Sequence, residues 1–165
     1  MKKIAVGLIK SVCLFVCVFM CFSLTGCITV SSTFKFQQGP EEVVSMRIYY
    51  VDISTIDYEL NEDDLLKYEP VCEIGQERYA EIMEKIEGYT FKSAMLLIAP
   101  APSPSFGYCN YILYVEYADG GKSILDQQTR VNYDSEGEII DCNHYDFNVE
   151  YDELLEQLAG GQPKE

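Results

Sequence analysis

The stretch "YCNYILYVEYADGGKSILDQQTRV", residues 108–131, decides the fold that we expect for this chain. Residues 110–117 are rich in β-branched and aromatic side chains, which predicts a strand. The Asp-Gly-Gly sequence at 119–121 is typical of a hairpin turn, and residues 122–128 are predicted to form the second strand. Apolar side chains occupy both odd and even positions of the first strand. We therefore expect a central strand that is at least partly covered on both faces of a sheet.

Other segments of the chain carry the same strand signals. The sequence "VVSMRIYYVDI" (43–53) is β-branched and aromatic, and strand character returns at 89–99. Residues 71–74 form a short candidate strand. A second turn at 134–137 precedes a further strand at 138–142. Short turns between successive strands favour antiparallel pairing.

Three helices are predicted from apolar periodicity and from capping. A short helix at Glu62–Lys67 has Asn61 as its N-cap, and a final amphipathic helix spans Tyr151–Leu158. The clearest helix spans Glu77–Glu87, because four of its apolar residues fall at i, i+3, i+4 and i+7. These four residues are Tyr79, Ile82, Met83 and Ile86.

The order of these elements predicts an α+β fold. We expect a single domain at 43–160, with a twisted, mainly antiparallel sheet and helices packed on one face. Residues 161–165 are predicted to be a C-terminal tail, and residues 27–42 a tether in front of the domain. Within the tether, Phe34 and Phe36 alternate with polar residues, which is also compatible with a strand in the sheet.

The N-terminus has the layout of a secretory signal. Lys2 and Lys3 precede an apolar run from residue 4 to residue 24, and small residues follow. The sequence Leu24-Thr25-Gly26-Cys27 resembles the lipobox of bacterial lipoproteins. This resemblance implies that a peptidase removes residues 1–26 and that the thiol of Cys27 carries diacylglycerol. It also implies a location on the extracytoplasmic face of the cell membrane.

The alternative is an uncleaved transmembrane helix within residues 4–30, a segment long enough to span a bilayer. Lys10 lies inside this segment, and a lysine at the centre of a membrane helix costs about 2.5–3.5 kcal/mol. We therefore favour the lipid anchor over the transmembrane helix.

The net charge restricts the partners that this chain can bind. All 27 acidic residues follow the signal segment, whereas 3 of the 12 basic residues lie within it, so the remaining 139 residues carry a charge of −18. This charge repels nucleic acid and anionic lipid, and it favours cationic partners. The same charge also serves simply to keep a surface protein soluble, and this is the interpretation that we favour.

The seven cysteines do not form a recognisable metal site. Three lie in the signal segment and Cys27 is the predicted lipid attachment, which leaves Cys72, Cys109 and Cys142. One disulfide with a free thiol, or three buried thiols, both fit this number, and Cys109–Cys142 is the pairing that we consider. No cofactor is expected, because there is no CxxC sequence and only one histidine.

Two acidic segments weakly resemble calcium loops. The first fails the pattern because Glu62 stands where the loop needs glycine and Tyr68 where it needs glutamate, so a solvated loop with a helix cap is the better interpretation. A polar hairpin turn explains the second. The oxygen-bearing residues are Asp57, Glu59, Asn61 and Asp63 in the first segment, and Asp134, Glu136 and Asp141 in the second.

The sequence offers no clear catalytic motif. His144 is the only imidazole, and its sequence neighbour Cys142 is a poor candidate for a nucleophile pair, because such partners normally come from separate elements. We expect His144 to be an ordinary residue at a strand end. The phosphate-loop, nucleophile-elbow and HExxH motifs are all missing from the sequence.

Thirteen tyrosines are the most unusual feature of the composition. Tyrosines gathered on strands suit an exposed recognition surface, but they also suit a half-buried sheet that lacks tryptophan, and we favour the sheet. The candidate binding surface consists of Tyr108, Tyr111, Tyr114 and Tyr117.

These observations favour a membrane-anchored, non-catalytic binding domain for an envelope protein or ligand. Two alternatives stay open. The first is an acidic inhibitor or immunity-type protein that caps a basic partner. The second is a carboxylate-dependent hydrolase, because the sequence contains too many acidic residues to exclude a catalytic pair.

Overall fold

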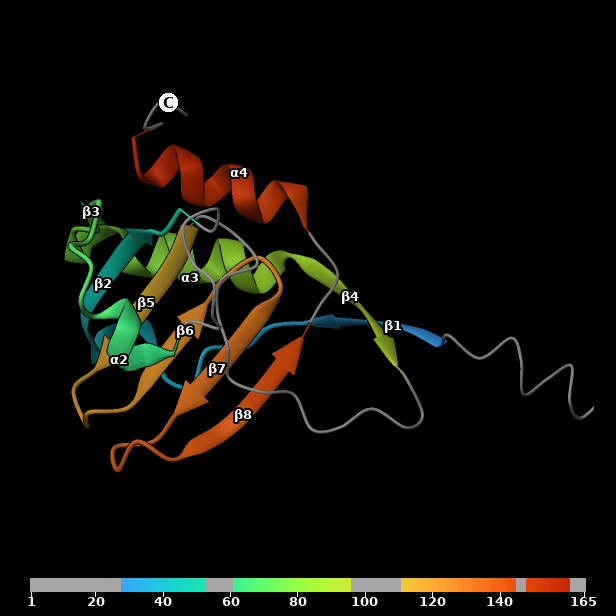
Figure 1. Cartoon of the computed structure of the whole chain (residues 1–165), viewed down its shortest axis with the longest axis horizontal. Coiled ribbons are helices and arrows are strands. Elements are labelled where there is room, and N and C mark those ends of the chain that lie inside the picture. Colours follow the sequence, from blue (N-terminus) through green and yellow to red (C-terminus); the bar gives the residue numbers. More distant parts are fainter. Residues whose placement is uncertain (1–27, 53–60, 96–110, 145–147, 161–165) are drawn as a thin grey trace, which may run out of the picture.

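The computed structural model describes residues 28–52, 61–95, 111–144 and 148–160. In these residues the strands form one six-stranded sheet and one two-stranded ribbon, with helices packed against the larger sheet (Figure 1). The strands are β1 (Ile28–Thr33), β2 (Val43–Tyr50), β3 (Cys72–Glu73), β4 (Thr90–Met95), β5 (Tyr111–Tyr117), β6 (Lys122–Leu125), β7 (Thr129–Tyr133) and β8 (Ile139–His144). The helices are α2 (Glu62–Leu65), α3 (Tyr79–Gly88) and α4 (Val149–Leu158), with short 3-10 turns η1 (Pro40–Glu42) and η3 (Gln76–Arg78).

The six-stranded sheet has the order β3-β2-β5-β6-β7-β8, and each described pairing is antiparallel. The predicted α+β class and antiparallel sheet are confirmed. β5 lies inside the sheet between β2 and β6, as its two-sided apolar pattern predicted. The turn into β6 uses Gly120, whose φ of +91° is easily reached only by a residue without a side chain.

Both faces of the sheet are covered, and each face has its own apolar core. On one face, Leu113 and Val115 of β5 pack in a core that includes the apolar stripes of α3 and α4. On the other face, Ile112 and Tyr114 pack in a smaller core with Leu65 of α2. The two longer helices therefore share one face as predicted, whereas the short helix α2 lies on the opposite face (Figure 1).

The helices form where periodicity and capping predicted them. The four apolar residues of the α3 stripe are all buried. Asn61 accepts a hydrogen bond from the backbone N–H of Asp64 at the start of α2, and Asn148 does the same for Tyr151 at the start of α4. Each cap satisfies a backbone donor that the first helical turn leaves without an internal partner.

The predicted tether at residues 27–42 is wrong for its described part. Residues 28–33 form β1, which pairs antiparallel with β4, and Ile28 already lies opposite Met95. Phe34 and Phe36 follow and are buried in the main core, with their rings 4.9 Å apart. Burial of these two rings gives the segment the apolar contacts that a solvated tether lacks.

The second strand of the central hairpin is shorter than predicted. β6 ends at Leu125, because the buried carboxylate of Asp126 accepts hydrogen bonds from the backbone N–H groups of Gln128 and Thr129. This turn reverses the chain into β7. Aspartate commonly forms turns by accepting a hydrogen bond from the backbone N–H two residues ahead. Asp126 was therefore a turn signal in the sequence that the predicted strand at 122–128 overlooked.

Among the described residues, Arg130 of β7 is the largest fully buried side chain. It is 1% exposed, and its guanidinium lies 3.3 Å from the centre of the Phe91 ring. The rings of Phe34 and Tyr151 lie within 5.6 Å of the same group. One cation therefore joins β7 to β4, to the segment after β1 and to α4.

We expect the substitution Arg130→Lys to lower the free energy of unfolding by about 1–3 kcal/mol. Lysine keeps the charge but loses the planar group that stacks on Phe91. Urea-induced unfolding, followed by circular dichroism, measures the change. The control Arg78→Lys changes an arginine that faces solvent and should shift stability by no more than about 0.5 kcal/mol. Equal stability of the two variants would contradict the role of Arg130.

Candidate functional site

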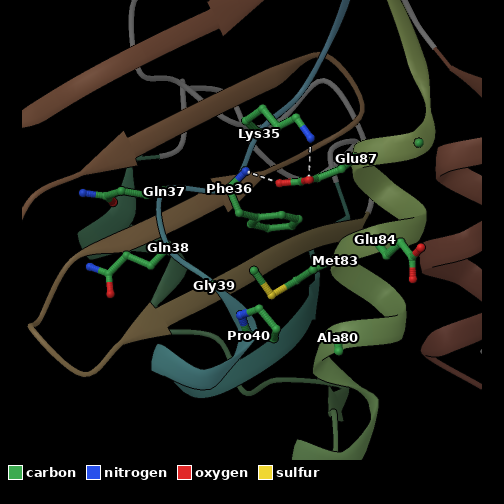
Figure 2. A pocket seen from close by; sticks show the side chains of 11 residues that line it. Lys35, Phe36, Gln37, Gln38, Gly39, Pro40, Ala80, Met83, Glu84 and Glu87 are labelled. Carbon is green, nitrogen blue, oxygen red and sulfur yellow. Dashed lines mark hydrogen bonds and ion pairs between the residues drawn. The ribbon is translucent and has the colours of Figure 1, made fainter.

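An open groove of about 700 Å³ runs between residues 35–40 and α3 (Figure 2). One wall is the segment that leads from β1 to β2, and the other is the adjacent side of the helix. Because the first wall follows the buried Phe34 and the second precedes β4, the packing of the main core determines their separation. The groove therefore exists only when the domain is folded, because its two walls come from different elements.

The floor of the groove is apolar. Phe36 and Met83 are 8% and 4% exposed, and the thioether of Met83 is directed toward the ring of Phe36 (Figure 2). Ala80 and Pro40 continue the same lining. Met83 belongs to the apolar stripe of α3, so the residue that packs the core also forms part of the floor.

Glu87 closes one end of the groove. Its carboxylate accepts a hydrogen bond from the Lys35 ammonium at 2.7 Å and another from the backbone N–H of Phe36 at 3.0 Å. The Lys35 side chain is 70% exposed and that of Glu87 is 28% exposed. A pair this exposed contributes about 0–1 kcal/mol to stability, so its main effect is to hold the segment against α3.

Polar side chains stand along both walls of the groove: Glu84 on α3, and Gln37 and Gln38 on the opposite segment. Glu84 lies one turn before Glu87 and is directed to solvent (Figure 2). On the other wall, Gln37 and Gln38 are directed away from α3, and Gln38 donates a hydrogen bond to Asp119 at 2.6 Å. An apolar floor beside carboxylates suits a side chain with an aliphatic stem and a cationic tip.

A second polar cluster lies on the α2 face of the sheet. Glu62 accepts a hydrogen bond from the Tyr114 hydroxyl at 3.2 Å and one from the Lys122 ammonium at 2.6 Å. Arg47 pairs with Glu116 at 3.1 Å, and its guanidinium lies 5.0 Å from the centre of the Tyr114 ring. These charges are paired within the domain, so the cluster joins α2 to β5 and β6.

Burial raises the pKa of several groups that could otherwise take part in proton transfer. It raises the pKa of Tyr114, with the negative charge of Glu62 adding to the effect, and it raises the pKa of Tyr133 to about 12. Burial also raises the pKa of the Cys142 thiol. At neutral pH these groups keep their protons, so they act as hydrogen-bond donors or apolar groups and are poor nucleophiles.

The structure does not place the predicted tyrosine surface on the outside. Tyr111, Tyr114 and Tyr117 are at most 3% exposed, because β5 is an interior strand covered on both faces. As an exposed surface the prediction is wrong for these three residues, and their burial fits the favoured alternative of a sheet interior. The hydroxyls of Tyr114 and Tyr117 bond to Glu62 and Ser123. Tyr108, the fourth predicted residue, lies outside the described residues.

The cysteines described are not paired. Cys72 and Cys142 carry free, partly buried thiols, so the considered Cys109–Cys142 disulfide is not formed in this structure. Cys109 and the predicted lipid attachment, Cys27, lie outside the described residues. His144 ends β8, close in sequence to Cys142, and the backbone of this strand end pairs with Thr129.

The acidic segments have local structural roles where they are described. Asn61 caps α2, while Asp57 and Glu59 lie outside the described residues. Asp134 accepts hydrogen bonds from the backbone N–H groups of Glu136 and Glu138 and so forms the β7–β8 turn. Within the described ranges, no three His, Cys, Asp or Glu side chains are grouped as metal ligands would be.

Comparisons with family models, with curated proteins and with solved structures found no match for this chain. Among the residues with a described position, no helix has the length and apolar character needed to cross a membrane. The groove must therefore be interpreted from its own chemistry.

Sequence reasoning did not find this groove. The Lys35–Glu87 pair joins residues 52 positions apart, and only the core contacts of Phe34 and Phe36 bring them together. The alternation of Phe34 and Phe36 with polar residues was the one local signal, since it indicated a segment with a buried side.

The raised pKa of Tyr133 predicts a loss of stability at high pH. Below pH 10, the ordinary pKa of tyrosine, both the folded and the unfolded state keep the proton. Between pH 10 and about 12 the unfolded state loses it first, so the free energy of unfolding falls as pH rises. We expect the contribution of this residue to be on the order of 2 kcal/mol.

Urea unfolding at a series of pH values above 9 measures this effect. The variant Tyr133→Phe should lose stability less steeply with pH than the unmodified protein, although the other buried tyrosines still contribute. The control Tyr68→Phe changes a tyrosine that is 36% exposed and should leave the slope unchanged. Identical slopes for all three proteins would refute the assignment.

Proposed function

We propose that this chain is a membrane-anchored extracytoplasmic lipoprotein whose domain binds a basic segment of an envelope protein or peptide without catalysing a reaction. The observation that carries the proposal is the groove beside α3, which has an apolar floor and a carboxylate rim. The charge of −18 that remains without residues 1–26 supports a cationic occupant.

The membrane anchor in this proposal rests on the sequence Leu24-Thr25-Gly26-Cys27, which resembles a lipobox. β1 begins at Ile28, so a lipid on Cys27 would sit next to the ribbon of β1 and β4. Six residues of strand span about 20 Å. The ribbon would thus hold the groove within a short distance of the membrane and not at the end of a long flexible linker.

The groove chemistry favours lysine or arginine side chains in the occupant. Phe36 and Met83 offer apolar contact to an aliphatic stem, while Glu87 offers a carboxylate to its charged end. Lys35 already makes such a contact with Glu87 from within the chain. An incoming cation would bind beside this pair or compete with it.

The first test concerns the anchor. We expect the full chain, expressed in a bacterium that is fed labelled palmitate, to carry the label and to sediment with the membranes. Cys27→Ser should remove the label, because only a thiol forms the thioether. The control Cys21→Ser changes a cysteine in the apolar run and should be labelled normally. Label retained by Cys27→Ser would exclude this anchor.

The second test concerns the groove. We would titrate the full chain, in detergent micelles, with a short peptide of lysine, leucine and proline by calorimetry. Binding should weaken as salt is raised from 0.1 to 1 M, because the screening length falls from about 10 Å to about 3 Å. Ala80→Arg places a bulky cation in the groove and should weaken binding at least about tenfold.

The matched control for the second test is Ala118→Arg, which adds the same charge at an exposed position of the β5–β6 turn. This variant should bind the peptide as the unmodified protein does. If both variants lose affinity equally, net charge and not the groove determines binding. If the unmodified protein does not bind the peptide, the groove proposal fails.

A further inference from the structure

The two edges of the six-stranded sheet differ greatly. At one edge, β3 has two residues and pairs only with Arg47 and Ile48 of β2. At the other edge, β8 is six residues long and pairs with β7 on one side through every residue except Ile140 (Figure 1). No strand among the described residues pairs with the outer side of β8. The backbone polar groups of that side can therefore pair with another chain.

β8 has only part of the protection that edge strands usually carry. Natural sheets protect their edges with very short strands, with charged residues (above all lysine), with proline and with β-bulges. β3 is short in this way, whereas residues 134–144 contain no lysine, arginine or proline. The one irregularity is a bulge at Ile140. Tyr133 pairs with Ile139 and Asn132 pairs with Asp141, so Ile140 has no partner on β7. From Asp141 to His144 the pairing with β7 is regular.

The bulge also exposes apolar surface at this edge. Ile139 and Ile140 are 46% and 55% exposed and stand next to each other in the sequence. Bulges often change the direction of side chains at sheet edges and beside functional sites. A strand that pairs along the regular part of β8 could extend its side chains onto these two isoleucines.

Charge decides which kind of chain can occupy this edge. Glu136, Glu138 and Asp141 are exposed along it. A second copy of this chain would bring the same three carboxylates to the interface, and like charges placed opposite each other destabilise a sheet. A strand that carries basic residues would meet them favourably.

We infer that the outer edge of β8 binds an extended, basic segment of a partner protein by adding it to the sheet as a further strand. The segment alternates lysine or arginine with β-branched residues. Its basic side chains contact the carboxylates of the edge, and its β-branched side chains contact Ile139 and Ile140. This mode of binding is separate from the groove and does not depend on the proposed function.

The test uses the full chain in detergent micelles and an eight-residue peptide of alternating lysine and valine. Hydrogen–deuterium exchange should slow at least about tenfold at the outward-facing amides within residues 139–144 when the peptide is bound. A peptide of alternating lysine and proline has the same charge but lacks half of the backbone donors. It should leave exchange in β8 unchanged.

Variants test the side chains at the edge. Ile140→Lys adds an edge-protecting charge that repels the peptide, and it should weaken binding at least about tenfold. The matched control Val149→Lys changes an equally exposed apolar residue, at 55%, in the first turn of α4 and should bind normally. Glu138→Gln removes one carboxylate and should weaken binding by a smaller factor.

Four outcomes overturn the inference. The first is equal protection of β8 by the lysine–proline peptide, and the second is unchanged binding of the lysine–valine peptide to Ile140→Lys. The third is slowed exchange that is confined to residues 35–40 and α3. The fourth is dimerisation of the chain through β8, detected by sedimentation. The third outcome would leave the groove proposal intact. Unchanged binding of the lysine, leucine and proline peptide to Ala80→Arg, with β8 protection preserved, would overturn the groove proposal and leave this inference intact.

Discussion

The contact between the Arg130 guanidinium and the Phe91 ring, at 3.3 Å, is the interaction on which the rest of the structure depends. A buried cation is costly to remove from water unless its surroundings compensate for the lost hydration. Phe34, Phe91 and Tyr151 surround the guanidinium with electron-rich ring faces, and these rings come from three separate segments. Arg130 thus fixes the β1–β4 ribbon and α4 against β7.

The groove depends on this packing. Phe34 directs the following residues, 35–40, along the side of α3, and Phe91 fixes the strand into which α3 leads. The pair between Lys35 and Glu87 then closes the remaining gap at one end. Because this pair is weak and exposed, it depends on the core for its geometry and adds little to the stability of the fold.

The tyrosines and the carboxylates have different roles: the tyrosines stabilise the interior, and the carboxylates give the surface its charge. Tyrosines such as Tyr49, Tyr111 and Tyr117 fill the interior of the sheet, where their rings bury a large apolar area and their hydroxyls remain protonated. The carboxylates lie mainly at the surface, where they repel one another and attract cations. In this arrangement the interior supplies stability, and the groove and the β8 edge are the surfaces that we propose as contacts for a basic partner.

The sequence by itself determined the elements that depend on local patterns. The stripe on α3, the cap Asn61, the turn at Gly120 and the two-sided character of β5 all follow from residues close together in the chain. The α+β class followed from their order.

Only the tertiary structure decided which aromatic residues are buried and which segments meet. Residues 28–36 looked like a tether because their partners, β4 and the main core, are distant in the sequence. Composition could not decide whether the tyrosines of β5 form a surface or fill the sheet, because exposure depends on neighbouring strands and helices. The groove and the open edge of β8 arise from pairings between distant segments, and single-sequence periodicity carries no information about those pairings.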